Sequence, residues 1–306
     1  MKAAYIEEAG GPEKIKIGEL PKPDPGSEGV LVRNQAAAVG PWDWKMLLGG
    51  WGKPLEFPYI PGFEAAGVVE QAPEGSGFKP GDEVWGRVQN AYAEYVVSDG
   101  TSLVRKPANI SFEGAASLVV GASTAYEGII DRMKLQPGET ILVTAASGGV
   151  GSAAVQIAAS IGARVIGVSS AGNRDYVLSL GAQQAYDYNV DGWADAVREA
   201  VPGGVDVLFD AFGGQTGEQA LKALRDGGRG AFIAWPQPDW QAEGRGITGE
   251  GFSAGTPRER FEAINRLVEA GKLKPQVTET LPLEQTRKAL EESQTGHTRG
   301  KIVLKV

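Results

Sequence analysis

Cysteine is absent from the 306 residues of this sequence. Disulfide bonds, thiol catalysis and thiolate metal ligands are therefore excluded. Histidine is nearly absent as well, because His297 is the only one. Since a zinc site is normally built from several His or Cys ligands, the sequence predicts no metal site.

Long apolar runs and an excess of basic residues are also missing. No apolar run approaches the ~20 residues that a transmembrane helix needs. A net charge of −8 and a pI near 5.0 argue against nucleic acid or an anionic membrane as a partner. The first residues, MKAAYIEEAGG, lack the basic-then-apolar order of a signal peptide. This favours a cytoplasmic location.

Glycine, by contrast, is abundant: 44 residues are about twice the usual ~7% share. Several glycines lie between a short apolar run at 140–144, typical of a buried parallel strand, and residues 150–161, where apolar side chains recur at helical spacing. Small residues at such a turn let backbone N–H groups and a helix N-terminus approach a pyrophosphate. The alternative is a tight strand–helix connection without a ligand. Because both flanking elements are present, the dinucleotide-binding interpretation is favoured. The residues predicted to bind the cofactor here are Ser147, Gly148, Gly149, Val150 and Gly151.

The pattern of predicted elements divides the chain. Residues 1 to about 120 show short β-like runs separated by Pro- and Gly-rich turns, which indicates an irregular antiparallel β domain. A helix is expected after Ser111, and a second at 121–133. From 140 onward strands and helices alternate, with an expected edge strand at 246–252, and this order predicts a doubly wound parallel sheet.

Several motifs in sequence order resemble the medium-chain dehydrogenase/reductase superfamily, and specifically its zinc-free quinone oxidoreductase branch. They are VGPWDWK (39–45), PYIPGFEAAGVV (58–69), GFKPGDEVWG (77–86), the glycine turn at 145–156 and GHTRGKIV (296–303). The resemblance implies an α/β fold in which a Rossmann-type parallel sheet is inserted in a GroES-like β domain. The implied domains are a catalytic GroES-like domain, 1–120 with 272–306, and a dinucleotide-binding domain, 121–271.

Two positions differ from zinc-dependent members, which carry a catalytic cysteine where Gly40 stands and a histidine where Phe63 stands. Metal-assisted alcohol oxidation is therefore not expected. Zinc-free members often have asparagine at the Gly40 position, so their active-site contacts do not transfer directly to this sequence.

The choice of cofactor is predicted from the strand at 164–168. An NAD site places Asp or Glu about 20 residues after the glycine turn, whereas here Ser169, Ser170 and Arg174 follow the strand. Two hydroxyls and a guanidinium suit the 2′-phosphate of NADPH. Two alternatives stay open: Arg174 is a solvated residue of the next helix, or Asp175 is the acid of an NAD site. NADPH is the expected cofactor.

Further cofactor contacts are implied only by the resemblance. They fall on Thr124, Tyr188, Phe212 and Ala234. Lys301 either reaches the pyrophosphate or is a charge on an edge strand. Family members commonly pair the edge strands of two cofactor sheets, so a homodimer joined at 246–252 is expected.

The expected chemistry is hydride transfer from NADPH to a small-molecule electron acceptor: a quinone, or an α,β-unsaturated carbonyl (an enone or enal). No tyrosine is followed four residues later by lysine, and no metal site is predicted, so ketone reduction lacks an acid. A conjugated or quinone acceptor needs mainly orientation. The cleft between 43–59 and 148–151 is the expected site. Lys45, Trp51 and Tyr59 are the candidate catalytic residues, and Trp42, Phe63 and Tyr92 are further pocket candidates. Lys45 either stabilises the enolate oxygen that develops during the reaction or is a surface lysine without a role in it. Asp43 is expected to hold the backbone in place. The rival is a non-catalytic NADPH-binding structural or regulatory protein.

Overall fold

The computed structural model of the protein describes residues 1–50, 54–241 and 244–306. These residues form two compact units. Unit 1 contains Met1–Val120, Thr256–Glu269 and Pro275–Val306, and unit 2 contains Gly121–Gly255 and Ala270–Lys274. In sequence, the main segment of unit 2 is thus inserted between the segments of unit 1.

Unit 1 is built on antiparallel strands. Its main sheet has the order β14 (Val277–Pro282), β15 (Lys301–Lys305), β3 (Val30–Val39), β4 (Glu64–Gln71), β5 (Glu83–Arg87), β7 (Leu103–Arg105), and β6 (Tyr95–Ser98) pairs with β3 away from this path. Only the β14–β15 pair is parallel among these. A separate antiparallel pair is formed by β1 (Lys2–Tyr5) and β2 (Lys16–Glu19). The expected irregular β domain is confirmed.

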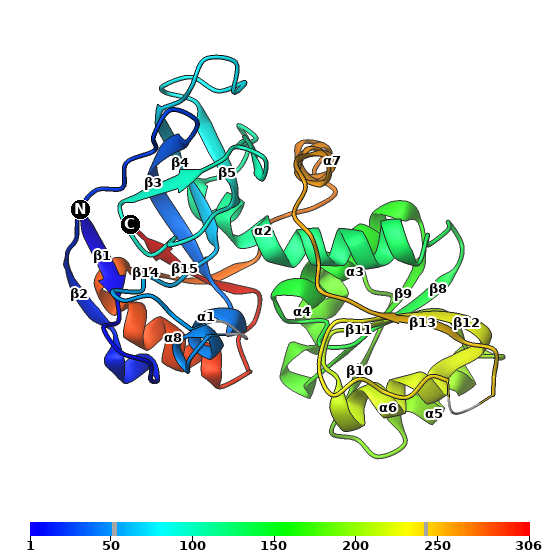
Figure 1. Cartoon of the computed structure of the whole chain (residues 1–306). Coiled ribbons are helices and arrows are strands. Elements are labelled where there is room, and N and C mark those ends of the chain that lie inside the picture. The colour runs from blue at the N-terminus through cyan, green and yellow to red at the C-terminus, as the bar shows by residue number, and fades with distance from the viewer. Residues whose placement is uncertain (51–53, 242–243) are drawn as a thin grey trace. The chain divides into compact units, whose positions relative to one another are not determined.

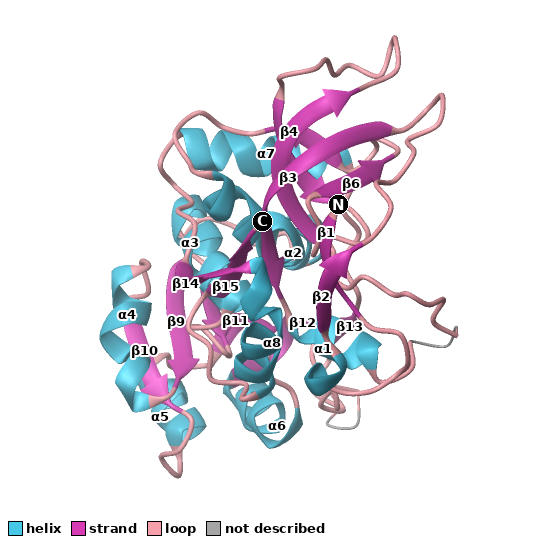
Figure 2. Ribbon diagram, turned by 90° about the vertical axis from the view of Figure 1, so that its left-hand side faces the viewer, coloured by secondary structure: helices cyan, strands magenta, loops and turns pink. Residues whose placement is uncertain are grey.

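Helices close this unit on several sides. Helix α1 (Pro41–Leu47) lies beside α8 (Thr286–Gln294), as Figure 2 shows. Helix α7 (Arg258–Glu269) belongs to the range that the expected division assigns to the dinucleotide-binding domain, yet it packs on unit 1. The ring of Phe261 meets Trp85 edge-on at 4.9 Å, and Trp85 Nε1 donates a 3.0 Å hydrogen bond to Asn265 Oδ1.

Unit 2 contains a six-stranded parallel sheet. The order is β10 (Gln184–Asp187), β9 (Arg164–Ser169), β8 (Thr140–Val143), β11 (Val205–Asp210), β12 (Leu224–Phe232), β13 (Thr248–Gly251). Every neighbouring pair is parallel. This is the strand order of a doubly wound dinucleotide-binding sheet, so the predicted fold class is confirmed. Strand β13 is an edge strand, as the sequence predicted.

Helices cover both faces of the parallel sheet (Figure 1). α3 (Gly149–Ile161) packs on β8 and β9. Figure 1 shows α5 (Trp193–Ala200) and α6 (Gly214–Ala223) on the opposite side of the strands. Their apolar side chains, such as Val197 and Leu221, join a buried cluster with Leu208 and Phe232. Helix α4 (Arg174–Ser179) follows β9.

Two boundaries differ from the prediction. The helices expected after Ser111 and at 121–133 are one helix, α2 (Phe112–Tyr126), continued by a π-helical segment (Glu127–Arg132). Gly121 does not break it, because a Cβ there would lie 2.7 Å from the carbonyl oxygen of Gly149, and glycine permits this close approach. The alternating pattern predicts a strand from Gly230 to Trp235, whereas β12 starts six residues earlier, at Leu224, and includes Gly227 and Gly228. No helix in the described part of the chain is long and apolar enough to cross a bilayer.

Candidate functional site

The glycine turn of unit 2 presents the N-terminus of α3 without a capping side chain. β8 ends at Val143, a turn follows, and Gly148 is the N-cap with φ −79° and ψ 179°. Ala145 takes φ +47°, and its carbonyl oxygen accepts a 2.9 Å hydrogen bond from the N–H of Gly148. A Cβ on Gly151 would lie 2.0 Å from that same oxygen, so only glycine fits at this position. Uncapped N–H groups at a helix N-terminus are suited to an anionic ligand.

The parallel sheet brings the other predicted cofactor residues to the edge where this turn lies. Ser169 ends β9, Tyr188 follows β10, Phe212 follows β11 and Ala234 follows β12. Because the strands are parallel, their carboxyl ends share one edge of the sheet, and the strand order reverses between β8 and β11. The rings of Tyr188 and Phe212 lie 5.3 Å apart, and 45% of Phe212 is exposed. Residues far apart in sequence therefore lie along one edge of the sheet.

A buried hydrogen-bonded pair at this edge was missed by the sequence analysis. Thr144 Oγ1 donates to Asp210 Oδ1 at 2.5 Å, and both side chains are fully buried. The N–H groups of Ala211 and Phe212 in turn donate to Thr144 Oγ1. A Cβ on Gly217 would lie 2.5 Å from the other Asp210 oxygen. The pair ties the loop after β11 to the glycine turn. A detectable signal was an aspartate ending an apolar strand just before two glycines.

The residues proposed to choose the cofactor lie together after β9. Ser169 is buried, and its hydroxyl donates to the carbonyl oxygen of Ser170 at 3.2 Å. Ser170 precedes a 3₁₀ turn (Ala171–Asn173), and its hydroxyl oxygen accepts from the Asn173 amide at 3.1 Å. Arg174 begins α4 with an exposed side chain, 3.8 Å from the exposed carboxylate of Asp175. A guanidinium and a carboxylate are thus both accessible at this point.

Thr124 comes from α2 rather than from a strand end. It lies one turn after Gly121, whose close approach to Gly149 places α2 against the start of α3. Thr124 is almost fully buried.

Unit 1 contains a second polar cluster, around Gly40. Asp43 Oδ2 accepts a 2.7 Å hydrogen bond from the N–H of Gly40 and another of 2.7 Å from the hydroxyl of Tyr92. Burial raises the pKa of Asp43 to about 6, although the bonds from Gly40 and Tyr92 oppose this. Asp43 therefore fixes the entry to α1, as expected, and Tyr92 is a core side chain with no exposed surface rather than a pocket residue.

A buried ion pair adjoins this cluster. Lys301 Nζ donates to Glu64 Oε1 at 2.5 Å, and Glu64 Oε2 accepts from the N–H of Val120 at 2.9 Å. A Cβ on Gly40 would lie 3.4 Å from Lys301 Nζ and 3.5 Å from Glu64 Oε1. β15 lies between β14 and β3, so the edge-strand interpretation of Lys301 is wrong. Glu64 was missed by the sequence analysis, because its partner is 237 residues away.

The predicted catalytic residues differ in their surroundings. Lys45 is exposed on α1, with Nζ 5.3 Å from the ring centre of Trp44 and 5.9 Å from that of Trp42. Tyr59 is half-buried and pairs with Ile6 through backbone hydrogen bonds of 2.9 Å. Burial, with a contribution from the Asp43 charge, raises the pKa of Tyr59 to about 12. Trp51 lies outside the described residues.

Comparison with known proteins gives matches over nearly the whole chain. The alcohol dehydrogenase GroES-like domain family matches residues 26–108, and the zinc-binding dehydrogenase family matches residues 180–304. A quinone oxidoreductase of Lama guanicoe is 31% identical over an alignment of 322 positions, which covers 99% of this chain and 97% of that protein. The chain belongs to the medium-chain dehydrogenase/reductase superfamily.

Other members of this superfamily are equally similar. A 2-methylene-furan-3-one reductase of Solanum lycopersicum is 31% identical over 99% of this chain and 79% of its own length. The crystal structure of an NAD-dependent alcohol dehydrogenase has a TM-score of 0.93 and 32% identity, and each chain covers 100% of the other. The protein is therefore an oxidoreductase of this superfamily, with a fold that binds a nicotinamide cofactor and relatives that act on small molecules.

The residues present do not fit the zinc ion that some members of the superfamily use. The chain has no cysteine and one histidine. The described residues include no group of three His, Asp or Glu side chains placed to hold a metal. The nearest side-chain atom to a Cβ on Gly40 would be the Lys301 ammonium, which repels a cation.

Proposed function

We propose that this protein is a zinc-independent oxidoreductase that transfers hydride from NADPH to a quinone or to an α,β-unsaturated carbonyl. The observation that carries the proposal is the environment of Gly40. Where zinc-dependent relatives have a metal ligand, this chain has no side chain, and a lysine–glutamate pair and a second carboxylate surround the position. These surroundings of Gly40 do not suit the reduction of an acceptor that needs a Lewis acid.

The cofactor half of the proposal rests on unit 2. The uncapped start of α3 would hold the pyrophosphate, with Gly151 needed for the turn itself. The exposed guanidinium of Arg174 and the hydroxyls of Ser169 and Ser170 would hold the 2′-phosphate of NADPH. The similar crystal structure with a TM-score of 0.93 is that of a protein named for NAD. The choice between NADPH and NADH therefore depends on whether the bound cofactor contacts the Arg174 guanidinium or the Asp175 carboxylate.

The chain's own part in the reaction is to bind, orient and exclude water. NADPH, when bound, supplies the hydride, and one proton from solvent completes the reduction of an enone. Tyr59 keeps its proton at neutral pH, because its pKa is raised to about 12, so it can donate a hydrogen bond to an acceptor oxygen but is a weak acid. Lys45, charged and exposed, is proposed to steady the negative charge that develops on an enone oxygen.

The proposal also covers assembly and location. We propose a homodimer joined through the edge strand β13, acting in the cytoplasm. β13 pairs on one side with β12, and an edge of this kind is a template for a second strand. Light scattering at micromolar concentration tests the dimer: an apparent mass of one chain would contradict it.

The test of function is a panel of acceptors read by NADPH absorbance. It contains a benzoquinone, an enone, an enal and a simple ketone, each with and without EDTA. Turnover of the quinone or enone that is unchanged by EDTA is expected. Turnover of the ketone that EDTA abolishes would refute the proposal. Cofactor binding without turnover of any acceptor would instead support the non-catalytic alternative.

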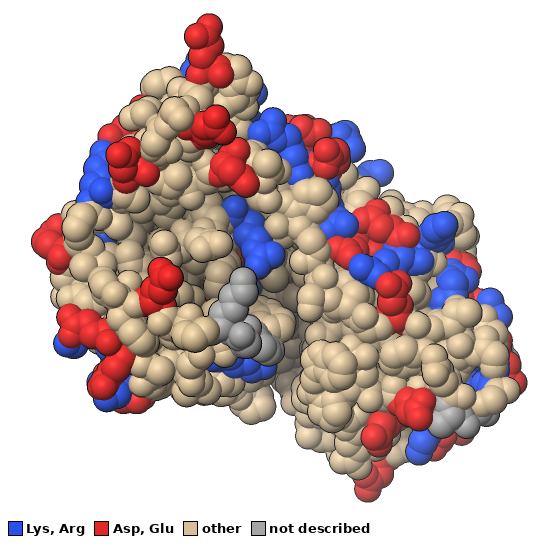
Figure 3. Space-filling model, viewed as in Figure 1, with Lys and Arg blue, Asp and Glu red and all other residues tan. Residues whose placement is uncertain are grey.

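The surface charge agrees with a small-molecule acceptor. On the face shown in Figure 3, basic and acidic side chains are interspersed among large areas of other residues. The whole chain carries a net charge of −8, and the described residues visible on this face form no continuous basic area of the kind that nucleic acid requires.

A further inference from the structure

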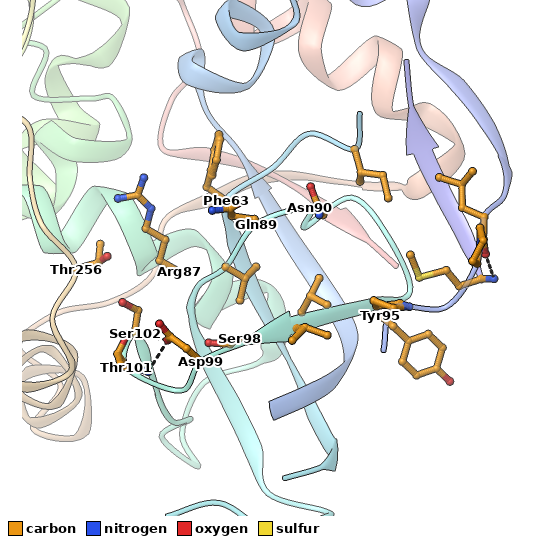
Figure 4. A pocket seen from close by; sticks show the side chains of 18 of the residues that line it. Phe63, Arg87, Gln89, Asn90, Tyr95, Ser98, Asp99, Thr101, Ser102 and Thr256 are labelled. Atoms are coloured by element: carbon orange, nitrogen blue, oxygen red, sulfur yellow. Dashed lines mark hydrogen bonds between the residues drawn. The ribbon is translucent and has the colours of Figure 1, made fainter. Parts of the chain in front are cut away.

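A cavity of about 720 Å³ lies within unit 1, along strand β6. Figure 4 shows Phe63 and Arg87 at one end of it and Tyr95 at the other. The volume is typical of a small-molecule site. Its lining includes Phe63, Arg87, Val97, Asp99 and Thr101.

Arg87 is the only lysine or arginine among the described residues that line this cavity. It is exposed, and its guanidinium carbon lies 5.7 Å from the ring centre of Phe63. No carboxylate among the described residues lies within ion-pair distance of it. The N–H of Arg87 donates to the carbonyl oxygen of Ser102 at 3.1 Å, which fixes the backbone from which the side chain extends.

Among the described residues of the lining, the one carboxylate is hydrogen-bonded to another residue. Asp99 Oδ1 accepts from the N–H of Thr101 at 2.8 Å and from its hydroxyl at 2.7 Å. These two bonds lower the pKa of Asp99, so it is a charged turn residue at neutral pH. In Figure 4 the Asp99 carboxyl group faces Thr101, whereas the guanidinium of Arg87 extends toward Phe63, away from it.

The rest of the lining is mixed. Leu20, Val97 and three prolines are apolar, whereas Gln89, Asn90 and Ser102 are polar. A ligand that fits has one negative group at the Arg87 end and a body with both apolar and hydrogen-bonding groups. A single guanidinium matches a carboxylate, since its fork pairs with two oxygens that share one charge, whereas a phosphate dianion calls for more donors.

The cavity adjoins the buried cluster of unit 1 through the backbone. Phe63 directly precedes Glu64, the partner of Lys301, and its carbonyl oxygen accepts a 3.1 Å hydrogen bond from the N–H of Val88, the residue after Arg87. Arg87 is therefore held at a fixed place beside residues that surround Gly40.

We propose that this cavity selects acceptors that carry a carboxylate, and that Arg87 is the residue that determines this specificity. The proposal rests on the proposed function, because it names the acceptor class of that reaction. The Arg87 guanidinium pairs with the carboxylate, Phe63 holds the guanidinium in place, and the mixed lining around Val97 binds the body of the acceptor.

Two matched acceptors test this proposal: 3-benzoylacrylate and its neutral amide, 3-benzoylacrylamide. The ratio of kcat/KM for the acid to that for the amide is measured in three variants. Arg87→Met should lower the ratio about tenfold, as expected when a hydrogen bond to a charged group is lost, and Arg87→Lys should restore part of it. Arg105→Met is the matched control, because Arg105 also lies over a phenylalanine, Phe78, outside the cavity lining. It should leave the ratio unchanged.

Failure of this proposal is distinguishable from failure of the proposed function. An equal ratio in the unmodified protein and in Arg87→Met would overturn the specificity role while leaving the reductase intact. If neither acceptor is reduced, the proposed function fails, and saturation-transfer NMR with benzoate still decides the site. Transfer to benzoate that disappears in Arg87→Met and persists in Arg105→Met supports it; transfer that is equal in both overturns it. Inorganic phosphate that displaces benzoate at equal concentration would contradict the choice of carboxylate.

Discussion

Tyr92 donates a 2.7 Å hydrogen bond to Asp43 in a part of unit 1 where neither side chain reaches solvent to a significant extent. The contact depends on Gly62, which has φ +97° and whose Cβ would lie 2.5 Å from the Tyr92 ring. Glycine is therefore needed at position 62 for the tyrosine to reach the carboxylate and for the carboxylate to hold the N–H of Gly40. One residue of the turn thus sets the geometry of the whole cluster.

The first prediction concerns pH. The pKa of Asp43 rises from 3.8 to about 6 on folding. The native state holds this proton where the unfolded chain has lost it, so the contribution of Asp43 to stability is greatest below pH 3.8 and is lost as the pH rises through about 6. Two pKa units correspond to about 3 kcal/mol. The free energy of unfolding of the unmodified protein, minus that of Asp43→Asn, should fall by about this amount between pH 3.5 and pH 8. Urea titrations at both pH values measure this difference. Asp195→Asn, an exposed position on α5, is the control variant. A difference that is independent of pH would contradict the prediction.

The second prediction concerns the glycine turn. Gly151→Ala places a Cβ 2.0 Å from the Ala145 carbonyl oxygen, so the turn must move. We expect a loss of about 2–3 kcal/mol in the unfolding free energy of the cofactor-free protein, as for overpacking elsewhere. Gly172→Ala, where a Cβ meets no atom within 4 Å, should change it little. Equal stability of the two variants would show that the turn relaxes without cost.

The third prediction concerns the cofactor. Arg174→Ala should weaken NADPH binding by about 1.5–3 kcal/mol, as expected for a hydrogen bond to a charged group, and should hardly affect NADH. Isothermal titration with both cofactors measures this. Asp175→Ala is the paired variant, because it removes the neighbouring carboxylate. If Asp175→Ala weakens NADH binding and Arg174→Ala changes nothing, the site is one for NAD.

The fourth prediction concerns Lys45. Lys45→Met should lower kcat and kcat/KM of enone reduction together, with the dissociation constant of NADPH unchanged, because only the transition state carries charge on the acceptor oxygen. Lys14→Met, a surface lysine paired with Glu8, is the control. Unchanged turnover in Lys45→Met would identify Lys45 as a surface residue whose ammonium merely lies near Trp42 and Trp44.

The sequence was informative where the structure depends on local pattern. The strand, turn and helix at 140–161, the parallel sheet and its edge strand were all predicted from runs and spacing, and each is found. Tyr188, Phe212 and Ala234 were named only from the resemblance, and the parallel sheet explains why they lie at the same edge as Ser169, the last residue of β9.

The sequence was uninformative where two hydrogen-bonded side chains are far apart along the chain. Glu64 and Lys301 are 237 residues apart, and Thr144 and Asp210 are 66 apart, so no window of sequence contains both members of either pair. The continuity of α2 through Gly121 was missed for a related reason. Glycine disfavours a helix locally, and only the approach of Gly149 explains its presence.

Strand β15 has a consequence for how the protein is made. It lies between β14 and β3 in the main sheet of unit 1, so β3 lacks one of its neighbours until residues 301–305 have left the ribosome. The parallel sheet of unit 2 lies within residues 140–251, so it can form before residues 301–305 are synthesised. Nascent chains should therefore gain a protease-resistant unit 2 first, because the lysine that pairs with Glu64 is synthesised only after the whole of that sheet.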